Sequence, residues 1–327
     1  MTKFIAEIGG NHKGDFDLAK AIVMDCLKSK ADIIKLQLYS ATGLVNVKQD
    51  KTRHEHFKTF ELSRGQYIEL AKMIKDHGKL FCVSVWDVSM MEWIYPYVDV
   101  WKIGSGDFTS LPLIEKVYEF GKPVILSTGL CSKTEVDSVI SKIRDFNNFD
   151  KVDTILMQCT SMYPIPYVEA NLAVIDDYSN SYVDVSVGYS DHTIGSDALR
   201  ISIAKGVDFI EFHYTLNSAD TTFRDNLVSL ERRDVQELDL WREKVVDLLG
   251  SPLKTPTNSE IESGHVKSFR RSVYVNRNVL KGESIRYSDL VFLRPYVDNS
   301  LSPIDVDRQF HLIANKDYDY LDPIFLY

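Results

Sequence analysis

Two short stretches of the sequence, Tyr189-Ser-Asp-His-Thr193 and Glu211-Phe-His-Tyr-Thr-Leu216, are the most informative about fold and function. Each stretch lies at the end of a predicted strand and contains a histidine. Because one helical segment, residues 196–205, joins them, the two strands should be parallel and adjacent. His192 and His213 would then lie side by side at the C-terminal ends of the strands, which predicts a metal site with open coordination positions. The alternative is that each histidine caps a loop or pairs with a carboxylate.

The same alternation of strand and helix runs from residue 3 to about residue 250. Short, continuous apolar runs are typical of parallel strands that are covered on both faces. Eight such units predict an α/β fold, a (β/α)8 TIM barrel over residues 1–250, with an open doubly wound sheet as the alternative. No Gly-x-Gly-x-x-Gly motif follows the first strand, which counts against a dinucleotide-binding fold. The predicted strands are residues 4–7, 33–38, 80–85, 98–103, 123–127, 154–158, 183–188 and 207–212.

The strand–helix alternation ends and the composition changes after residue 250. Two prolines and several small polar residues predict a linker over residues 251–268. Residues 269–327, with a turn at Lys281-Gly-Glu283, predict a small, mostly β domain that is marginal alone and should dock on another surface. The predicted helices of the barrel are residues 16–28, 63–77, 111–120, 134–146, 167–178, 196–205 and 232–249, with a short crossover at residues 88–95.

The composition excludes several classes of function. A net charge of −9 argues against a broad nucleic-acid-binding surface, although a local cationic pocket is compatible with it. No apolar run is long enough for a membrane span, and the N-terminus has no signal pattern. The four cysteines are scattered without metal-binding spacing. We therefore expect a cytoplasmic protein that binds neither nucleic acid nor a membrane.

Polar residues recur at the ends of the predicted strands. Glu7 ends the first strand, and Lys35 and Gln37 lie inside the apolar second strand. A buried ammonium needs a partner, so Lys35 is either functional or part of a structural ion pair, with Glu7 as the candidate partner. The fourth strand ends in Trp101-Lys-Ile-Gly-Ser-Gly-Asp107, where glycines allow the backbone to approach a ligand.

Hydroxyl groups follow the later strands, and their convergence predicts an anion held by neutral donors and balanced by a lysine. Any one of these serines could instead be a helix N-cap. The predicted phosphate-binding set comprises Lys102, Ser105, Ser127, Ser161 and Ser190, and Tyr163 follows the sixth strand nearby.

The chain resembles the sialic acid synthase family, which includes N-acetylneuraminate, legionaminate and pseudaminate synthases. The resemblance spans nearly the whole barrel in order, and the tail is similar to the antifreeze-like (SAF) domain of these enzymes. In the tail it rests on Arg271-Ser272, residues 279–283, Asp289-Leu290 and Arg294-Pro295. In the barrel it rests on residues 5–14, Lys35-Leu-Gln37, residues 102–107, Leu126-Ser-Thr-Gly129, Tyr189-Ser-Asp-His192, His213-Tyr-Thr-Leu216 and residues 225–230.

This resemblance implies a transferase that condenses phosphoenolpyruvate with an N-acetylated aldose, giving a nine-carbon α-keto acid and phosphate. It also implies a divalent cation, Mn²⁺ or Mg²⁺, held by His192 and His213 and acting as a Lewis acid on the sugar aldehyde. The hydroxyl and lysine set would contact phosphoenolpyruvate. The remaining positions implied by the family are Glu7, Lys35 and Asp107 for catalysis and Gln37, Tyr163, Asp225 and Arg294 for the substrates.

The same resemblance implies a domain-swapped homodimer, in which Arg294 reaches the sugar bound by the partner subunit. The sequence departs from the family pattern mainly around the acceptor. Phe212 replaces a usual lysine, Asp107 replaces a glutamate found in many members, and no glycine follows Arg294-Pro295. The donor is therefore better defined than the acceptor sugar.

Three alternatives remain open from the sequence. The first is a synthase of a shorter 3-deoxy-ulosonic acid that uses a phosphorylated aldose. The second is a Schiff-base aldolase with Lys35 or Lys102 as its nucleophile. The third is a catalytically degenerate sugar-binding barrel.

Overall fold

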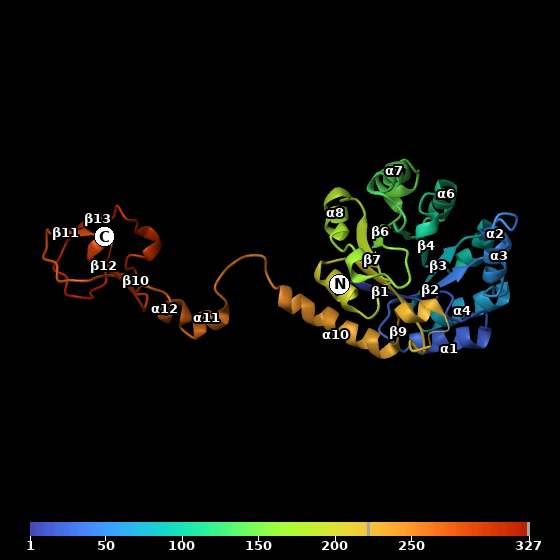
Figure 1. Cartoon of the computed structure of the whole chain (residues 1–327), viewed down its shortest axis with the longest axis horizontal. Helices are drawn as coiled ribbons and strands as arrows, with labels where there is room; N and C mark the ends of the chain where they lie inside the picture. The colour runs from blue at the N-terminus through green and yellow to red at the C-terminus, as the bar shows by residue number, and fades with distance from the viewer. Residues whose placement is uncertain (221–222, 326–327) are drawn as a thin grey trace. The chain divides into compact units, whose positions relative to one another are not determined.

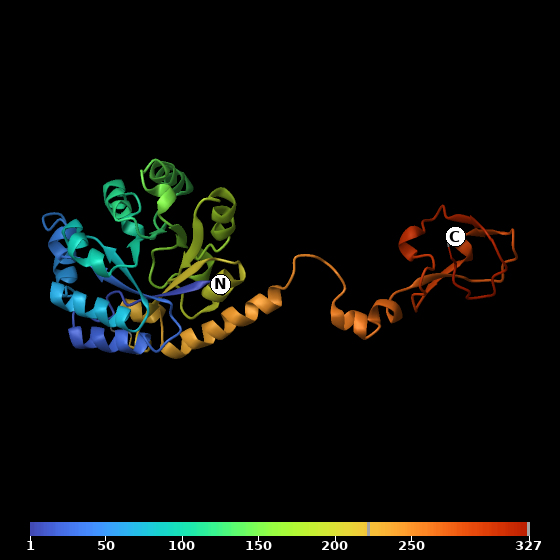
Figure 2. The same ribbon diagram turned by 180° about the vertical axis from the view of Figure 1, so that it is seen from behind.

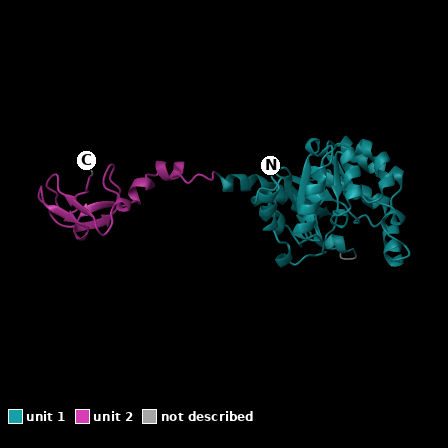
Figure 3. Ribbon diagram, turned by 90° about the horizontal axis from the view of Figure 1, so that it is seen from above, with its two compact units in different colours: residues 1–250 teal, residues 251–327 magenta. Residues whose placement is uncertain are grey.

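The computed structural model of the protein describes residues 1–220 and 223–325. The chain forms two compact units, residues 1–250 and residues 251–327 (Figure 3). No helix among the described residues has the length and apolar character that crossing a membrane would require.

The first unit is a closed barrel of eight parallel strands, as predicted (Figure 1). Each strand pairs with the next one along the chain, and β1 pairs with both β2 and β8. This closure excludes the open doubly wound sheet. The strands are β1 (Lys3–Glu7), β2 (Ile33–Leu38), β3 (Leu80–Val85), β4 (Val100–Ile103), β5 (Val124–Ser127), β6 (Thr154–Cys159), β7 (Ser186–Ser190) and β8 (Phe209–Tyr214), and the short β9 (Ser229–Leu230) extends the sheet beside β8.

Helices surround the strands on the outside of the barrel (Figures 1 and 2). Several begin with a side-chain cap, such as the capping box of Ser63 with Gln66 and that of Ser132 with Glu135. The α-helices of this unit are α1 (Phe16–Cys26), α2 (Ala41–Leu44), α3 (Lys51–Lys58), α4 (Arg64–Asp76), α5 (Met91–Ile94), α6 (Leu111–Glu119), α7 (Lys133–Arg144), α8 (Val174–Ser181), α9 (Asp197–Ala204) and α10 (Arg232–Leu249).

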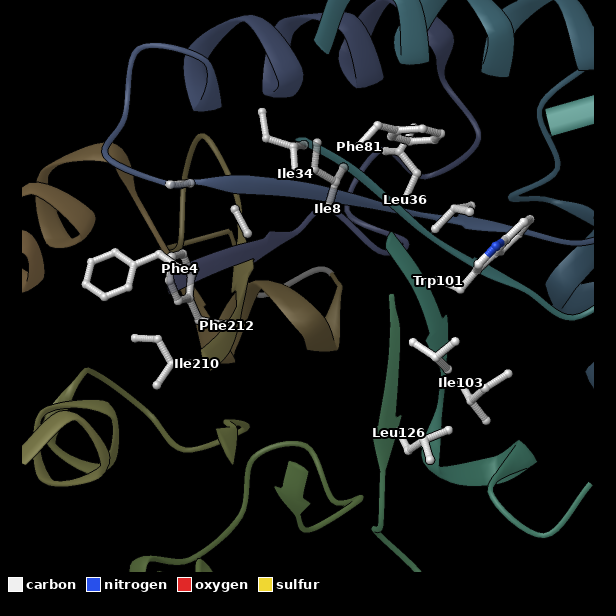
Figure 4. Packing of buried hydrophobic residues seen from close by; sticks show 14 of the residues in the cluster. Phe4, Ile8, Ile34, Leu36, Phe81, Trp101, Ile103, Leu126, Ile210 and Phe212 are labelled. Carbon is white, nitrogen blue, oxygen red and sulfur yellow. The ribbon is translucent and has the colours of Figure 1, made fainter. Parts of the chain in front are cut away.

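Side chains along each strand alternate between the outside and the inside of the barrel, and the inward side chains form two layers. Residues that face outward, among them Phe4, Ile34, Phe81 and Trp101, are buried in the core around the strands (Figure 4). The inward residues form an apolar floor: Ile5, Ile33, Cys82, Val100, Ile125, Ile155 and Met157. Side chains two positions further along a strand point to the same side, so a polar layer stands on this floor. It comprises Glu7, Lys35, Ser84, Lys102, Ser127, Cys159 and Glu211.

Several boundaries differ from the sequence prediction. β7 begins at Ser186 and β8 at Phe209, each later than predicted, because residues 183–185 form a turn and residues 207–208 are irregular. The predicted helix over residues 167–178 is broken into a 3-10 turn, Tyr167–Glu169, and α8, since Asn171 between them adopts a left-handed φ of 48°. Helices α2 and α3, between β2 and α4, were not predicted.

The second unit is small and mostly β. Strand β10 (Ser272–Val275) pairs antiparallel with β12 (Leu290–Leu293), and β11 (Ser284–Arg286) pairs antiparallel with β13 (His311–Ile313). Its own core contains Val273, Val275, Ile285, Tyr318 and Ile324, all buried. The segment predicted as a linker carries two short helices, α11 (Asn258–Glu262) and α12 (His265–Ser268).

Candidate active site

A cavity of about 690 Å³ lies at the C-terminal ends of the barrel strands. This is the end at which TIM-barrel enzymes carry their active sites. The cavity brings together all the candidate residues that the sequence places in the barrel. They are Glu7, Lys35, Gln37, Lys102, Ser105, Asp107, Ser127, Ser161, Tyr163, Ser190, His192, His213 and Asp225.

The remaining candidate, Arg294, belongs to the second unit. It follows β12 directly and is exposed. Its guanidinium carbon lies 5.7 Å from the centre of the Phe269 ring.

A network of four buried charges occupies the bottom of the cavity. Glu211 accepts hydrogen bonds from Lys102 Nζ at 2.7 and 2.9 Å and from Lys35 Nζ at 2.7 Å. Lys35 also forms an ion pair with Glu7, so the predicted pairing of these two residues is confirmed. Two lysines and two carboxylates are thus held together in the polar layer, and each is almost fully buried.

Opposing effects set the pKa values in this network. Burial raises the pKa of a carboxyl group, but the two lysines outweigh burial and hold the pKa of Glu211 far below its usual value. Burial lowers the pKa of Lys35 to about 8 even though Glu211 favours its charged form. Burial also opposes the charge of Lys102, yet Glu211 raises the pKa of Lys102 above its usual value. Lys102 is therefore an ammonium held in place by Glu211.

Sequence reasoning missed Glu211, although a signal was present. Glu211 lies two positions before His213 on β8, so both side chains point to the interior of the barrel. In the sheet register, Glu7 stands opposite both Lys35 and His213, and Ser190 stands opposite Glu211. The alternation of side chains along each strand and the order of the strands together place these residues in one layer of the barrel interior.

Hydroxyl groups and a glycine form a small concave cradle beside Lys102. Gly129 N donates a hydrogen bond to Ser105 Oγ at 3.1 Å. A Cβ atom added to Gly129 would lie 2.5 Å from Ser161 Oγ and 2.6 Å from Ser105 Oγ, so only glycine fits between the two hydroxyls. Ser127 Oγ is fully buried and has no hydrogen-bond partner among the described residues. A buried hydroxyl without a partner indicates a position for a ligand or water.

The two histidines lie next to each other as predicted. Their ring centroids are 5.4 Å apart, and the Tyr163 ring lies 4.0 Å from that of His192 and 5.6 Å from that of His213. His192 Nδ1 lies 2.8 Å from the carbonyl oxygen of Thr160. Because a carbonyl can only accept, Nδ1 carries a proton and the lone pair of a neutral His192 is on Nε2.

The electrostatic surroundings of the histidines differ. Burial, followed by the charges of His192 and Lys35, lowers the pKa of His213 well below its usual value, so this imidazole is neutral. Its Nδ1 is buried without a hydrogen-bond partner among the described residues, and Asp225 Oδ2 lies 4.0 Å away. Burial opposes the imidazolium form of His192, but Cys159 and the Thr160 carbonyl outweigh it and raise the pKa. In the imidazolium form of His192, Nε2 also carries a proton, and a cation that binds Nε2 would have to displace it.

The donor set fits a metal that is held by two protein ligands and completed by water or substrate. In residues 1–220 and 223–325, no group of three or more His, Cys, Asp or Glu side chains is arranged to hold a metal ion. Two suitable donors are the neutral His213, whose Nδ1 has no partner in the described part of the chain, and the oriented lone pair of His192.

Two carboxyl groups above the charge network have raised pKa values. Burial raises the pKa of Asp107, which lies in a 3-10 turn directly after β4, to about 6. Burial also raises the pKa of Asp225, against the lowering effect of Arg224. A carboxyl group with a pKa near neutrality can exchange a proton with a substrate or water under physiological conditions.

Additional lining residues come from the segment between β2 and α4 and from the loop after β8. Arg53 and Phe57 lie on α3, Trp86 follows β3, and Arg224 precedes Asp225. Sequence reasoning missed them. No regular apolar pattern marks α3, and none of its residues is buried.

The chain is similar to several proteins over most of its length. It is 36% identical to an uncharacterized protein of Methanocaldococcus jannaschii over 90% of this chain and 85% of that protein. It is 31% identical to an N,N'-diacetyllegionaminic acid synthase of Legionella pneumophila over 90% of this chain and 86% of that protein. It is 30% identical to an N-acetylneuraminate-9-phosphate synthase of Homo sapiens over 95% of this chain and 87% of that protein.

Similarity extends to a solved structure and to a family. The crystal structure of an N-acetylneuraminic acid synthetase from Leptospira borgpetersenii superposes with a TM-score of 0.72 at 28% identity, covering 81% of this chain and 90% of that chain. Residues 22–254 match the NeuB family. The resemblance seen in the sequence motifs is therefore confirmed, and the chain belongs to the NeuB family.

Proposed function

We propose that this protein condenses phosphoenolpyruvate with an N-acetylated aldose to give a nine-carbon α-keto acid and phosphate. One observation carries the proposal: a lysine-and-hydroxyl cradle and a pair of adjacent histidines share a single cavity. The cradle suits the phosphate of phosphoenolpyruvate, and the histidines suit a cation that activates an aldehyde. The names of the Legionella and human relatives point to the same class of reaction.

In this proposal, Lys102, Ser105, Ser127, Ser161 and Ser190 bind phosphoenolpyruvate. Charge-assisted hydrogen bonds from an ammonium and several hydroxyls match the oxygens of a phosphate monoester. Glu211 keeps Lys102 charged, and Glu7 together with Glu211 keeps Lys35 in position. Gln37 and Tyr163 line the adjoining space, where we place the acceptor with Asp225 bound to its hydroxyls.

His192 and His213 would hold the divalent cation, Mn²⁺ or Mg²⁺. When bound, this cation would polarise the aldehyde oxygen of the open-chain sugar as a Lewis acid. The C2–C3 π electrons of phosphoenolpyruvate form the bond to the aldehyde carbon, and the aldehyde oxygen takes up a proton and becomes a hydroxyl. Water adds at the electron-poor C2 and gives one proton to the Asp107 carboxylate. The new C2 hydroxyl then loses its proton as the C2–O bond to phosphate breaks, which leaves a keto group and inorganic phosphate.

The charges of the cavity support a role for a cation. Phosphoenolpyruvate carries a carboxylate and a phosphate, about −2.5 to −3 in total near pH 7. The lining has no excess of positive charge to balance it, because its carboxylates outnumber its cationic side chains. The carboxylates are Glu7, Asp50, Asp107, Glu211 and Asp225, and the cationic side chains are Lys35, Arg53, Lys102 and Arg224. A divalent cation at the histidines would add two positive charges and make the net charge of the lining positive, which favours binding of the anion.

The direct test is release of inorganic phosphate from phosphoenolpyruvate in the presence of Mn²⁺ and a set of acceptors. The set comprises N-acetylmannosamine, its 6-phosphate, diacetamido hexoses and, as a contrast, phosphorylated aldoses without an acetamido group. We expect turnover only with acetamido sugars. Turnover with the non-acetamido aldoses alone would indicate a shorter 3-deoxy-ulosonic acid synthase. Borohydride trapping of pyruvate on Lys35 or Lys102 would indicate a Schiff-base aldolase, and no turnover with any acceptor would refute the proposal.

The raised pKa of Asp107 predicts the acid limb of the pH profile. As a base, Asp107 works in its carboxylate form, whose fraction rises with pH and levels off above a pKa of about 6. We expect kcat/KM to increase about tenfold per pH unit below this value. Asp107→Asn should lose this limb and lower the plateau about 10²- to 10⁴-fold, whereas Asp107→Glu should retain the limb. An unchanged acid limb in the Asn variant would remove Asp107 from this role.

We also propose that the protein acts as a domain-swapped homodimer in which Arg294 contributes to the partner's acceptor site. Support comes from the family and from the chemistry of an exposed arginine stacked on Phe269. Sedimentation of the full chain and the KM of Arg294→Ala for the acceptor test this assembly. A monomeric, fully active protein would exclude it.

A further inference from the structure

We infer that Arg53 and Arg224 form a clamp for a phosphate group at the far end of the acceptor, so that the acceptor is an N-acetylhexosamine carrying a 6-phosphate. This inference rests on the proposed function and specifies the class of its second substrate. It starts from two arginines that the proposed reaction does not use.

Both arginines are held in the same way. The guanidinium carbon of Arg53 lies 5.6 Å from the centre of the Phe57 ring, and that of Arg224 lies 4.9 Å from the centre of the Tyr163 ring. Stacking on an aromatic ring fixes the plane of a guanidinium and leaves its N–H edge free. Such an edge matches the oxygens of a phosphate in a bidentate arrangement.

The two arginines also share their surroundings. Both line the main cavity and a second cavity of about 400 Å³, which His56, Phe57 and Phe223 complete. Helix α3 is anchored across this region, because its residue Phe57 packs against Trp86 at 6.1 Å between ring centroids. Phe60, just after the helix, packs against Phe223 at 5.3 Å. The loops after β3 and β8 therefore hold α3 where Arg53 lines the same cavities as Arg224.

Arg53 lacks a carboxylate partner among the described residues, whereas several other arginines of the barrel unit have one. Arg144, Arg232 and Arg242 each form an ion pair with an aspartate. The Arg53 guanidinium lies over the Phe57 ring and forms neither an ion pair nor a hydrogen bond with any described residue. Arg224 uses Nε towards Asp225 Oδ1 at 3.3 Å, and its terminal nitrogens form no hydrogen bond or ion pair within residues 1–220 and 223–325. Two cationic groups with free donors at one cavity indicate an anionic ligand.

The position of the arginines fits the end of the sugar rather than the donor. The aldehyde belongs at His192 and His213, and Asp225 Oδ2 lies 4.0 Å from His213 Nδ1. Arg224 Nε lies 3.3 Å from Asp225 Oδ1, and Arg53 lines the same two cavities as Arg224, so both arginines lie on the Asp225 side of the histidines. The phosphate of phosphoenolpyruvate already has the cradle around Ser105, Ser161 and Gly129. A second phosphate, on the acceptor carbon farthest from the aldehyde, would meet Arg53 and Arg224.

The experiment compares N-acetylmannosamine with its 6-phosphate, using the full-length wild type, Arg53→Ala, Arg224→Ala and the control Arg64→Ala. Arg64 is stacked on Trp93 at 5.4 Å and does not line the cavity, so it controls for the loss of a stacked arginine. We expect the wild type to prefer the phosphorylated sugar. Each clamp variant should lower kcat/KM for this sugar about tenfold to a hundredfold, with a much smaller change for the free sugar and for the KM of phosphoenolpyruvate.

Calorimetric binding of N-acetylmannosamine 6-phosphate to the wild type and to Arg53→Ala gives a readout that needs no turnover. A wild type that prefers the free sugar would overturn the clamp while leaving the proposed function intact. Equal losses for both sugars, or a raised KM for phosphoenolpyruvate in the clamp variants, would also overturn it. Failure of the proposed function itself would appear differently, as absence of turnover with either sugar.

Discussion

Replacing His213 by alanine is expected to reduce condensation by at least about a thousandfold while the barrel remains folded. His213 is a buried, neutral imidazole whose Nδ1 has no partner among the described residues, and its ring lies 5.4 Å from that of His192. Its removal would take away one of the two nitrogen donors proposed for the cation, and with it the polarisation of the aldehyde. His192→Ala should have the same effect.

Metal binding provides an independent measurement for this prediction. Titration of Mn²⁺ followed by electron paramagnetic resonance should show a bound ion in the wild type and loss of that ion in both variants. His77→Ala is the matched control, because His77 Nδ1, like His192 Nδ1, lies 2.8 Å from a main-chain carbonyl. That carbonyl belongs to Met73, and His77 caps the C-terminal end of the outer helix α4. Circular dichroism and thermal unfolding would establish that the fold is intact. Near-normal turnover or Mn²⁺ affinity in either active-site variant would refute the role of the pair.

The sequence predicted most of this site because strand alternation and strand order act together. In a parallel barrel, the side chains that follow each apolar floor residue must reach the same level, as Ile5 and Glu7 or Ile33 and Lys35 do. The positions of His213, Ser127 and Ser190 follow from this geometry, whereas Ser105, Ser161 and His192 lie just after the ends of β4, β6 and β7. Glu211 could have been found in the same way, since it shares its face of β8 with His213.

Helix α3 and Arg53 could not be found by this reasoning. The sequence Lys-Thr-Arg-His-Glu-His-Phe-Lys of α3 is polar nearly throughout, so no apolar period predicts a helix there. Its place depends on Phe57 and Phe60, which contact Trp86 and Phe223, residues far away in the sequence. Such contacts are set by tertiary packing between loops, for which a single sequence gives no local signal.

Glu211→Ala is expected to cause the largest loss of stability of any single substitution in the cavity, about 3–5 kcal/mol. Glu211 is the carboxylate shared by Lys35 and Lys102, and all three side chains are almost fully buried. Without it, two ammonium groups would remain in the barrel with Glu7 as the one neighbouring carboxylate of the network. The free energy of unfolding is measured by urea denaturation of the wild type and the variant.

The origin of this loss can be identified from its dependence on pH. In the unfolded chain a lysine has a pKa of about 10.4. In the folded variant, the lost carboxylate would leave the pKa values of Lys35 and Lys102 below that value. Between the two pKa values the unfolded state binds more protons, so the unfolding free energy of the variant should rise with pH. The deficit relative to the wild type should therefore shrink between pH 7 and pH 10.

Two controls separate charge from size and burial from exposure. Glu211→Gln preserves the shape of the side chain but not its charge, and it should retain most of the deficit at pH 7 because the unpaired ammoniums cause it. Glu237→Ala removes an exposed helical ion pair with Arg233 and should cost less than about 1 kcal/mol at any pH. A Glu211→Ala deficit that is equally small, or that does not vary with pH, would show that the four buried charges do not act as one network. Lys102 would then need another source for the raised pKa that keeps it charged beside the phosphate cradle.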